Sequence, residues 1–217
     1  VSTMDKILFR KSLSQSDFFI HDHNIQGSTI LPGVAYLEMV RAAGELAQQS
    51  DIKMIEDVIW AAPITVKDKE KDSFVELSKV NGKIHYKVYY NEYGKSVVAS
   101  QGKLLTLLDA EDSLPVAYPI GELKNQLKNA IGHEEAYQYF AKLGFQYGDT
   151  FKCIDYIQSS HTEALGRYEI PKNQGMQWKT EGFQLIIPAM DAALQTIMGT
   201  GSSSQDGSEK QFIPFAL

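Results

Sequence analysis

The chain has 217 residues, of which 43% are hydrophobic and 22% are charged, a composition typical of one large globular domain or two small packed ones. Its formal net charge of −6 argues against a nucleic-acid partner, because phosphates attract clustered lysine and arginine side chains. No apolar run approaches the roughly 20 residues needed to span a membrane, and the single cysteine excludes an internal disulfide. The sequence therefore predicts a cytoplasmic protein without a membrane span.

The first elements along the chain predict one long buried helix. Short extended runs are expected at 7–13 and 18–20, followed by a polar loop or strand end over 21–29. A helix is expected to open with Pro32 at its first helical position, where the missing N–H costs nothing, and to continue to residue 49. Apolar residues recur along this helix at helical spacing on two sides, which indicates that it is buried.

A sheet and then a second set of elements are expected after this helix. Asn81-Gly82 predicts a hairpin turn, because this dipeptide favours the positive φ angles of tight turns. Strands are expected over 55–66, 73–80, 83–90, 96–107, 150–159, 162–170 and 212–217. Further helices are expected over 121–130, 134–143 and 188–198, with a linker over 109–119 and a loop over 199–210.

The order strand, helix, sheet thus occurs twice, which predicts an α+β double hot dog, with two antiparallel sheets each wrapped round a long helix. We predict an N-terminal hot dog over 1–108 that contains His23, a linker over 109–132 and a C-terminal hot dog over 133–217 that contains Asp191. The second hot dog is expected to be C-terminally shortened, because the sequence stops as a strand begins.

The stretch from His23 through Gly27 to Pro32 places a histidine just ahead of a glycine turn and a helix start. The first N–H groups of a helix are unpaired and carry partial positive charge, so they can stabilise an anion that develops nearby. A thioester carbonyl bound there would hold its α-carbon near a His23 base. A surface histidine beside a helix cap would have the same spacing, and the spacing alone leaves that alternative open.

Two further patterns are weak by themselves. Asp191 and Gln195 are four residues apart, so they share one face of a helix and the amide can hold the carboxyl group by a hydrogen bond. An ordinary solvated helix start would look the same. Tyr147-Gly148 would be interpreted, without other knowledge, as a turn beside a core aromatic.

Three segments together carry a resemblance to a known family. The segment His23–Met39, HNIQGSTILPGVAYLEM, resembles the catalytic histidine motif of polyketide synthase dehydratase domains. Asp191–Gln195, DAALQ, resembles the second motif of that family, and Leu143–Phe151 resembles its GxxYGPxF motif with Asp149 in place of proline. Where the family usually has His-Pro ahead of the aspartate, Ile186-Ile187-Pro188 stands here, which puts the local loop in doubt.

The resemblance reaches from near Ile7 to Leu217, and family members usually continue with further strands. It implies a double hot dog that removes water from a 3-hydroxyacyl thioester on an acyl carrier protein, with His23 as base and Asp191 as acid. Such an acid needs a pKa raised by burial. The implied residues that position the substrate are Gly33, Tyr147, Gly148 and Gln195, and the implied structural residues of the motif are Gly27 and Pro32.

The resemblance also implies cofactors and partners. No metal or other cofactor is expected, because the acyl chain arrives on a phosphopantetheine arm, which belongs to the substrate. The implied partners are an acyl carrier protein, neighbouring polyketide synthase domains and a second copy in a homodimer.

Three alternatives stay open. A relative of the same fold could move a double bond or close a cyclic ether, although such isomerising relatives tend to lose the acid or the motif proline, and Asp191 and Pro32 are present here. The chain could also be a non-catalytic domain that binds the carrier protein or holds a dimer. His21 and His23 could point the same way from one strand, as metal ligands do, but no third ligand has a matching motif.

Overall fold

The computed structural model describes residues 6–67, 69–106, 117–170 and 182–201. The described residues fall into two compact units. The first contains 6–20, 29–67 and 69–106, and the second contains 21–28, 117–170 and 182–201. The short segment 21–28, which includes His23, therefore belongs to the same unit as the C-terminal half of the chain.

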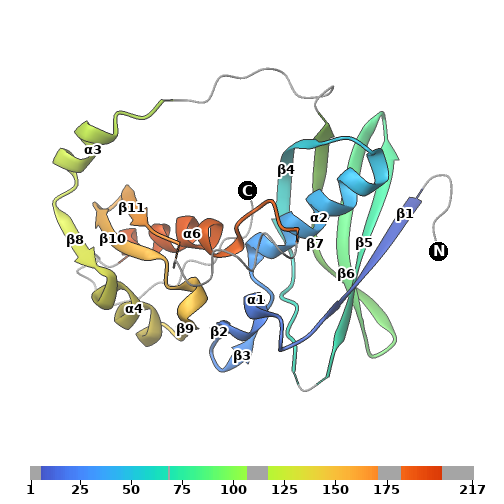
Figure 1. Cartoon of the computed structure of the whole chain (residues 1–217), viewed down its shortest axis with the longest axis horizontal. Coiled ribbons are helices and arrows are strands. Elements are labelled where there is room, and N and C mark those ends of the chain that lie inside the picture. Colours follow the sequence, from blue (N-terminus) through green and yellow to red (C-terminus); the bar gives the residue numbers. More distant parts are fainter. Residues whose placement is uncertain (1–5, 68, 107–116, 171–181, 202–217) are drawn as a thin grey trace. The chain divides into compact units, whose positions relative to one another are not determined.

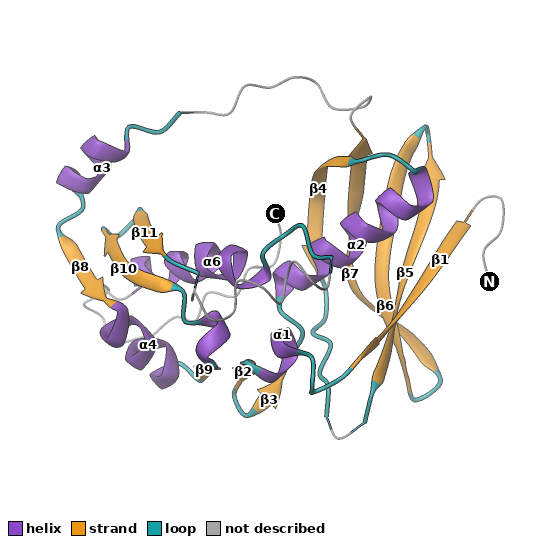
Figure 2. Cartoon of the chain, in the orientation of Figure 1, coloured by secondary structure: helices purple, strands orange, loops and turns teal. Residues whose placement is uncertain are grey.

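The first unit is a long helix, α2 (Gly33–Gln48), packed on antiparallel strands (Figure 1). The described strands of this unit pair in the order β1-β5-β6-β7-β4 (Figure 2). Their bounds are β1 (Lys6–Leu13), β4 (Ile52–Trp60), β5 (Lys71–Val80), β6 (Lys83–Glu92) and β7 (Lys95–Thr106). The hairpin predicted at Asn81-Gly82 is confirmed, since both residues have positive φ, 50° and 83°, between β5 and β6.

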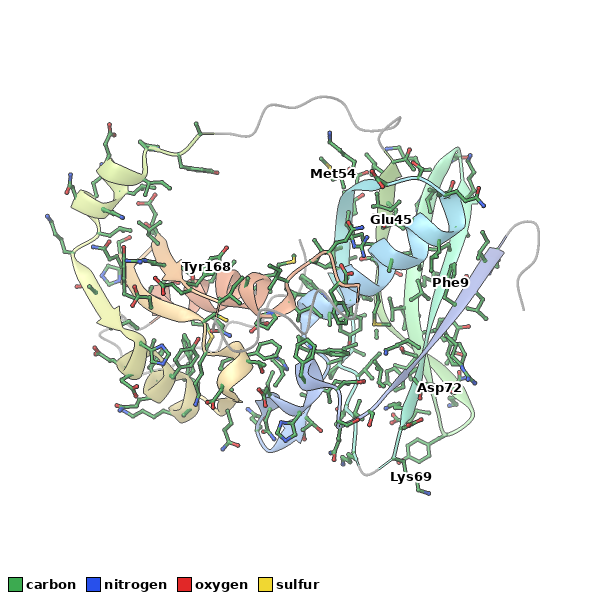
Figure 3. All side chains as sticks on the ribbon, viewed as in Figure 1. Phe9, Glu45, Met54, Lys69, Asp72 and Tyr168 are labelled. Atoms are coloured by element: carbon green, nitrogen blue, oxygen red, sulfur yellow. The ribbon has the colours of Figure 1, made fainter. Side chains whose placement is uncertain are left out.

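The helix α2 is held by packing and by an ion cluster along one side. A Cβ on Gly44 would lie 2.7 Å from Leu104 Cδ1, so a larger residue there would force the Leu104 and Ile52 side chains to shift. The Arg41 guanidinium donates to both carboxylate oxygens of Glu38 at 2.7 and 2.6 Å, and it pairs at 2.6 Å with Glu45, which is labelled in Figure 3. Burial of Arg41 is thus matched by paired charges.

The second unit is built round another long helix, α6 (Ile187–Gly201), which packs against strands β10 and β11. Its described strands form one sheet in the order β11-β10-β8, and β2 pairs separately with β9. The strand bounds are β2 (His23–Ile25), β8 (Asn129–Gly132), β9 (Phe145–Tyr147), β10 (Ile154–Ser159) and β11 (Ala164–Tyr168), whose last residue is labelled in Figure 3. The helix bounds are α3 (Ile120–Gln126), α4 (His133–Lys142) and the 3-10 turn η1 (Asp149–Phe151).

An apolar core holds the second unit together. It is formed by α4, β9, β10 and α6, which all turn large side chains inward. Its buried residues are Ala136, Phe140, Leu143, Phe145, Cys153, Ile154, Ile157, Ala192 and Met198. The core places β2 and the start of α6 on a common framework, and these are the two elements that carry His23 and Asp191.

Most of the predicted elements are confirmed, and several local predictions are wrong. The strand expected over 150–159 begins as the 3-10 turn η1 and is extended only from Ile154, and the strand expected over 55–66 ends at Trp60. Residues 18–20 are not extended but belong to α1 (Phe18–His21), which follows a turn in which Ser14 N donates to Asp17 Oδ2 at 2.9 Å and Asp17 N donates to Ser14 O at 3.0 Å. Pro32 is the cap residue ahead of α2 and not its first helical residue, since its ψ of 142° is extended.

The remaining predictions concern the C-terminal part of the chain. The helix expected over 188–198 is confirmed and continues to Gly201, into the start of the expected loop. The strand expected over 212–217 lies outside the described residues. The helix expected over 121–130 is confirmed as α3 over 120–126, whereas residues 129–132 form the strand β8. The division into 1–108, 109–132 and 133–217 stays a prediction.

Candidate active site

His23 is held inside the second unit by the pairing of β2 with β9. It lies opposite Tyr147 in the register of these strands, and only 5% of its surface is exposed. The imidazole packs against two aromatic rings, with centroid distances of 5.7 Å to Tyr147 and 5.4 Å to Phe151. Such packing fixes the ring in one orientation, as a general base requires.

A tight turn after β2 sets the direction of that strand. Gln26 and Gly27 have φ angles of 50° and 76°, the sequence of positive angles that a two-residue hairpin loop adopts between β2 and β3 (Ser28–Thr29). The backbone N–H of Gln26 donates to Gly144 O at 2.7 Å. Gly27, predicted as a structural residue of the motif, is thus placed at a backbone conformation that favours glycine.

Asp22 ties β2 to the 3-10 turn η1. Its Oδ2 accepts a hydrogen bond from Thr150 N at 3.1 Å and a second from the Thr150 hydroxyl. Burial raises the pKa of Asp22, but hydrogen bonds from Thr150 and His21 outweigh burial and hold that pKa below its usual value. We call this contact between Asp22 and Thr150 the Asp22 clasp.

Gly148, which lies between β9 and η1, supports the clasp. Its N–H donates to Asp22 O at 2.8 Å, and a Cβ at this position would lie 2.3 Å from Asp22 Cγ. Only glycine fits so close to the side chain. Gly148 was predicted to position the substrate, and the structure places it against the residue that precedes His23.

Asp191 and Gln195 lie four residues apart on α6 and share one face of the helix, as predicted. Gln195 Nε2 donates to Asp191 Oδ2 at 2.7 Å, and the two residues are 2% and 5% exposed, respectively. The other carboxylate oxygen, Asp191 Oδ1, lies 4.0 Å from His23 Nε2. The alternative of a solvated helix start is therefore wrong, and the histidine and aspartate chosen from the sequence meet within one compact unit.

The surroundings of the pair favour a protonated carboxyl group. Burial raises the pKa of Asp191, against the opposing effects of the nearby His23 and of the hydrogen bond from Gln195. Burial and the proximity of Asp191 also hold the pKa of Tyr147 well above its ordinary value. The same two causes raise the pKa of the Cys153 thiol to about 12, so this cysteine stays a neutral part of the core.

Two residues near the pair were missed by the sequence analysis, besides Asp22. The Tyr137 hydroxyl lies 3.1 Å from Gln195 Oε1, and the carbonyl oxygen of Phe151 lies 3.4 Å from Gln195 Nε2. Asp22 could have been found as a carboxylate next to a candidate base. Tyr137 gave no signal, because it lies 58 residues from Gln195 in a helix with no motif of its own.

Other predicted site residues belong to the first unit. Gly33 begins α2 and its carbonyl accepts a hydrogen bond from Trp60 Nε1 at 2.9 Å, and Pro32 precedes it as the cap. His21 ends α1 whereas His23 begins β2, so the two histidines do not share a strand as the metal alternative required. The described part of the chain holds no group of three or more His, Cys, Asp or Glu side chains able to bind a metal. No helix within the described ranges is both long and apolar enough to cross a membrane.

Comparison with known proteins assigns both halves of the chain to one kind of domain. A family model described as polyketide synthase dehydratase domain matches residues 1–91, and one described as polyketide synthase dehydratase N-terminal domain matches residues 120–217.

Curated relatives point to the same family. Polyketide synthases PksN and PksM of Bacillus subtilis (strain 168) are 30% and 28% identical to this chain over 224 and 225 residues. These alignments cover 100% and 96% of the chain but 4% and 5% of the relatives, so the chain spans about one twentieth of their length.

A solved structure extends the likeness to the fold. A dehydratase domain of a trans-AT polyketide synthase from Brevibacillus brevis matches with a TM-score of 0.85 at 26% identity, covering 100% of this chain and 76% of that one. The α+β double hot dog predicted from the sequence is thereby confirmed.

Proposed function

Because this chain belongs to the polyketide synthase dehydratase domains, we propose that it removes water from a 3-hydroxyacyl thioester to give the enoyl thioester. One observation carries the proposal: His23 Nε2 and Asp191 Oδ1, both buried, lie 4.0 Å apart in one compact unit. An elimination must remove a proton and a hydroxyl from neighbouring carbons, so it needs a base and an acid this close together.

His23 acts as the base in the proposed reaction. Its Nε2 takes a proton from the α-carbon, which the neighbouring thioester makes weakly acidic. The electron pair of that C–H bond forms the α–β double bond, and the C–O bond at the β-carbon breaks. The rings of Tyr147 and Phe151 hold the imidazole in place while the proton moves.

Asp191 acts as the acid. Hydroxide is a poor leaving group, so Asp191 donates a proton to it and water departs. Burial raises the pKa of Asp191 and so favours the protonated form that this step needs. The proton gained by His23 equals the proton lost by Asp191, and transfer between them restores the starting state.

Further residues have supporting roles in this proposal. Gln195 holds Asp191, and Gly148 and Tyr147 hold the strand that faces His23. Gly33, the first residue of α2, is proposed to help position the substrate, and Gly27 and Pro32 are proposed as structural residues of the histidine motif. The substrate is proposed to arrive on the phosphopantetheine arm of an acyl carrier protein, and neighbouring synthase domains and a second copy are the further proposed partners.

Turnover of a simple substrate tests the proposal. A 3-hydroxyacyl thioester of N-acetylcysteamine reproduces the end of the phosphopantetheine arm, and the enoyl product is followed by mass spectrometry. We expect the chain to form product and Asp191→Asn to form almost none, because the amide keeps the shape and removes the proton. A chain that binds acyl carrier protein but never forms product would favour the non-catalytic alternative. A product with a displaced double bond would favour the isomerase alternative.

A further inference from the structure

A tyrosine outside the sequence motifs is joined to Asp191 by hydrogen bonds. Gln195 Nε2 donates to Asp191 Oδ2 at 2.7 Å, and the Tyr137 hydroxyl lies 3.1 Å from Gln195 Oε1. Tyr137 comes from α4, whereas the other two residues lie on α6. The three side chains thus form a chain of hydrogen bonds that ends on the carboxyl group proposed as the acid.

The partners of Tyr137 decide how the Gln195 amide is oriented. A phenol carries one O–H, and two acceptors lie within its reach, Phe151 O at 3.0 Å and Gln195 Oε1 at 3.1 Å. Phe151 O has a second donor in Gln195 Nε2 at 3.4 Å, and the Ile154 N–H donates to the Tyr137 oxygen at 3.1 Å. Donation from Tyr137 to Gln195 Oε1 therefore leaves all of these polar groups paired.

We propose that Tyr137 is a positioning residue that decides which oxygen of Asp191 carries the proton. Its O–H holds Gln195 Oε1 away from Asp191 and so turns Nε2 toward Oδ2. Asp191 Oδ2 accepts the Gln195 N–H, so it cannot also point an O–H at that donor. The proton of the Asp191 carboxyl group is therefore confined to Oδ1. Oδ1 is the oxygen 4.0 Å from His23 Nε2. The inference rests on the proposed function, because only dehydration needs the proton on that side.

Without the Tyr137 hydroxyl, the side-chain amide of Gln195 could rotate so that its Oε1 and Nε2 exchange places. Its Oε1 would then face Asp191 Oδ2 and would accept a proton from it, so the acid's proton would leave Oδ1. This bond would stabilise the protonated carboxyl, and the carboxylate would lose its N–H donor. Both changes raise the pKa of Asp191. A slower reaction combined with a higher pKa of the acid is therefore the signature of the proposed role.

Tyr137→Phe tests the inference in the whole chain, with turnover of the N-acetylcysteamine thioester measured across pH. We expect kcat to fall by about tenfold to a hundredfold with KM unchanged, as for other residues that orient a reacting group. The alkaline limb of the kcat profile should move to higher pH, because that limb reports loss of the last proton of the His23–Asp191 pair. A fall in kcat with an unmoved alkaline limb would show a structural role alone and overturn the inference.

Tyr156→Phe is the matched control. Tyr156 is a half-buried tyrosine of β10 in the same unit, and its hydroxyl makes no hydrogen bond to any described residue. Both kcat and the alkaline limb should therefore keep their wild-type values. If this variant reproduced the effects of Tyr137→Phe, they would not depend on the bond to Gln195 and the inference would fail.

A vibrational measurement separates this inference from the proposed function, because it needs no turnover. The C=O stretch of the protonated Asp191 carboxyl is identified by its loss in Asp191→Asn. In the wild type Oδ2 is the C=O oxygen and accepts the Gln195 N–H, which lowers the stretching frequency. We expect Tyr137→Phe to raise it. A wild type that forms product, with an unchanged band in Tyr137→Phe, would overturn only the Tyr137 inference. A wild type that forms none, with a shifted band, would overturn only the proposed function.

Replacement of Tyr137 by 3-fluorotyrosine keeps the test decisive if the phenylalanine variant does not fold. Fluorine makes the hydroxyl a stronger donor to Gln195 Oε1, which polarises the amide and strengthens its bond to Asp191. The alkaline limb should then move to lower pH, opposite to the shift expected for phenylalanine. An unmoved limb, or a shift to higher pH, would overturn the inference.

Discussion

The substitution Asp22→Ala removes the Asp22 clasp and should lower both the stability and the activity of the chain. The carboxylate accepts two hydrogen bonds from Thr150, and a hydrogen bond to a charged group contributes about 1.5–3 kcal/mol. The Asp22 side chain is 18% exposed, so water replaces part of what is lost. We therefore expect the free energy of unfolding to fall by about 2–3 kcal/mol. We also expect kcat to fall by about tenfold to a hundredfold, because His23 follows directly in β2.

Urea unfolding and turnover of the thioester check these expectations, with Thr150→Val as the matched control. Valine keeps the shape of threonine and the N–H bond to Asp22, so only the hydroxyl bond is lost, at a cost of about 1.5 kcal/mol. The double variant should lose less than the sum of the two single variants, because the same contact is removed twice.

The pH dependence of stability gives the clasp a second test. Because the pKa of Asp22 is lowered in the folded chain, its stabilising effect is present above the ordinary value of 3.8 and is lost as pH falls through the lowered value. The wild type should therefore lose stability more steeply than Asp22→Ala on acidification. A variant with the unfolding midpoint, acid profile and turnover of the wild type would show that the clasp does not hold His23.

Three further outcomes follow from the geometry around His23. His23→Ala and Asp191→Asn should each lower turnover by about 10²–10⁴-fold with unchanged circular dichroism, and near-normal activity in either would remove that residue from the mechanism. Since base and acid lie 4.0 Å apart, substrates labelled stereospecifically at the α-carbon should lose hydrogen and hydroxyl from the same side, and loss from opposite sides would contradict the arrangement. Gly148→Ala should lower the unfolding midpoint, because its Cβ would lie 2.3 Å from Asp22 Cγ, and an unchanged midpoint would show that the strand can shift freely.

Local patterns in the sequence predicted much of the fold. Asn81-Gly82 predicted its hairpin because a tight turn depends on the φ preferences of its own residues. The helices that became α2 and α6 were predicted from apolar spacing. The helix α1 was missed, although the Ser14 and Asp17 turn that starts it is also local and could have been recognised.

The site was predicted only as far as its motifs reach. His23, Asp191 and Gln195 were chosen by resemblance, and the structure brings them together. The clasp joins residues 128 positions apart, and no periodicity or propensity connects Asp22 with Thr150. Which residues support a site depends on the parts of the chain that the fold brings together, so a single sequence gives little indication of them.

Asp22 and Asp191 have the same side chain, but their surroundings shift its pKa in opposite directions and so suit the two residues to different roles. Asp22 collects hydrogen bonds from Thr150 and His21 that outweigh burial, so its pKa is lowered and it stays a carboxylate that can only accept. Asp191 is more deeply enclosed and accepts one N–H from Gln195, so burial prevails and its pKa is raised. Asp191→Asn should therefore be more stable than the wild type, by an amount that grows as pH rises above 3.8, because the unfolded wild type ionises there whereas its folded form must keep the proton on Asp191 or bury a charge. Urea midpoints measured from acidic to neutral pH check this, and a gap that stays constant or narrows with pH would show that the acid is not held protonated by its surroundings.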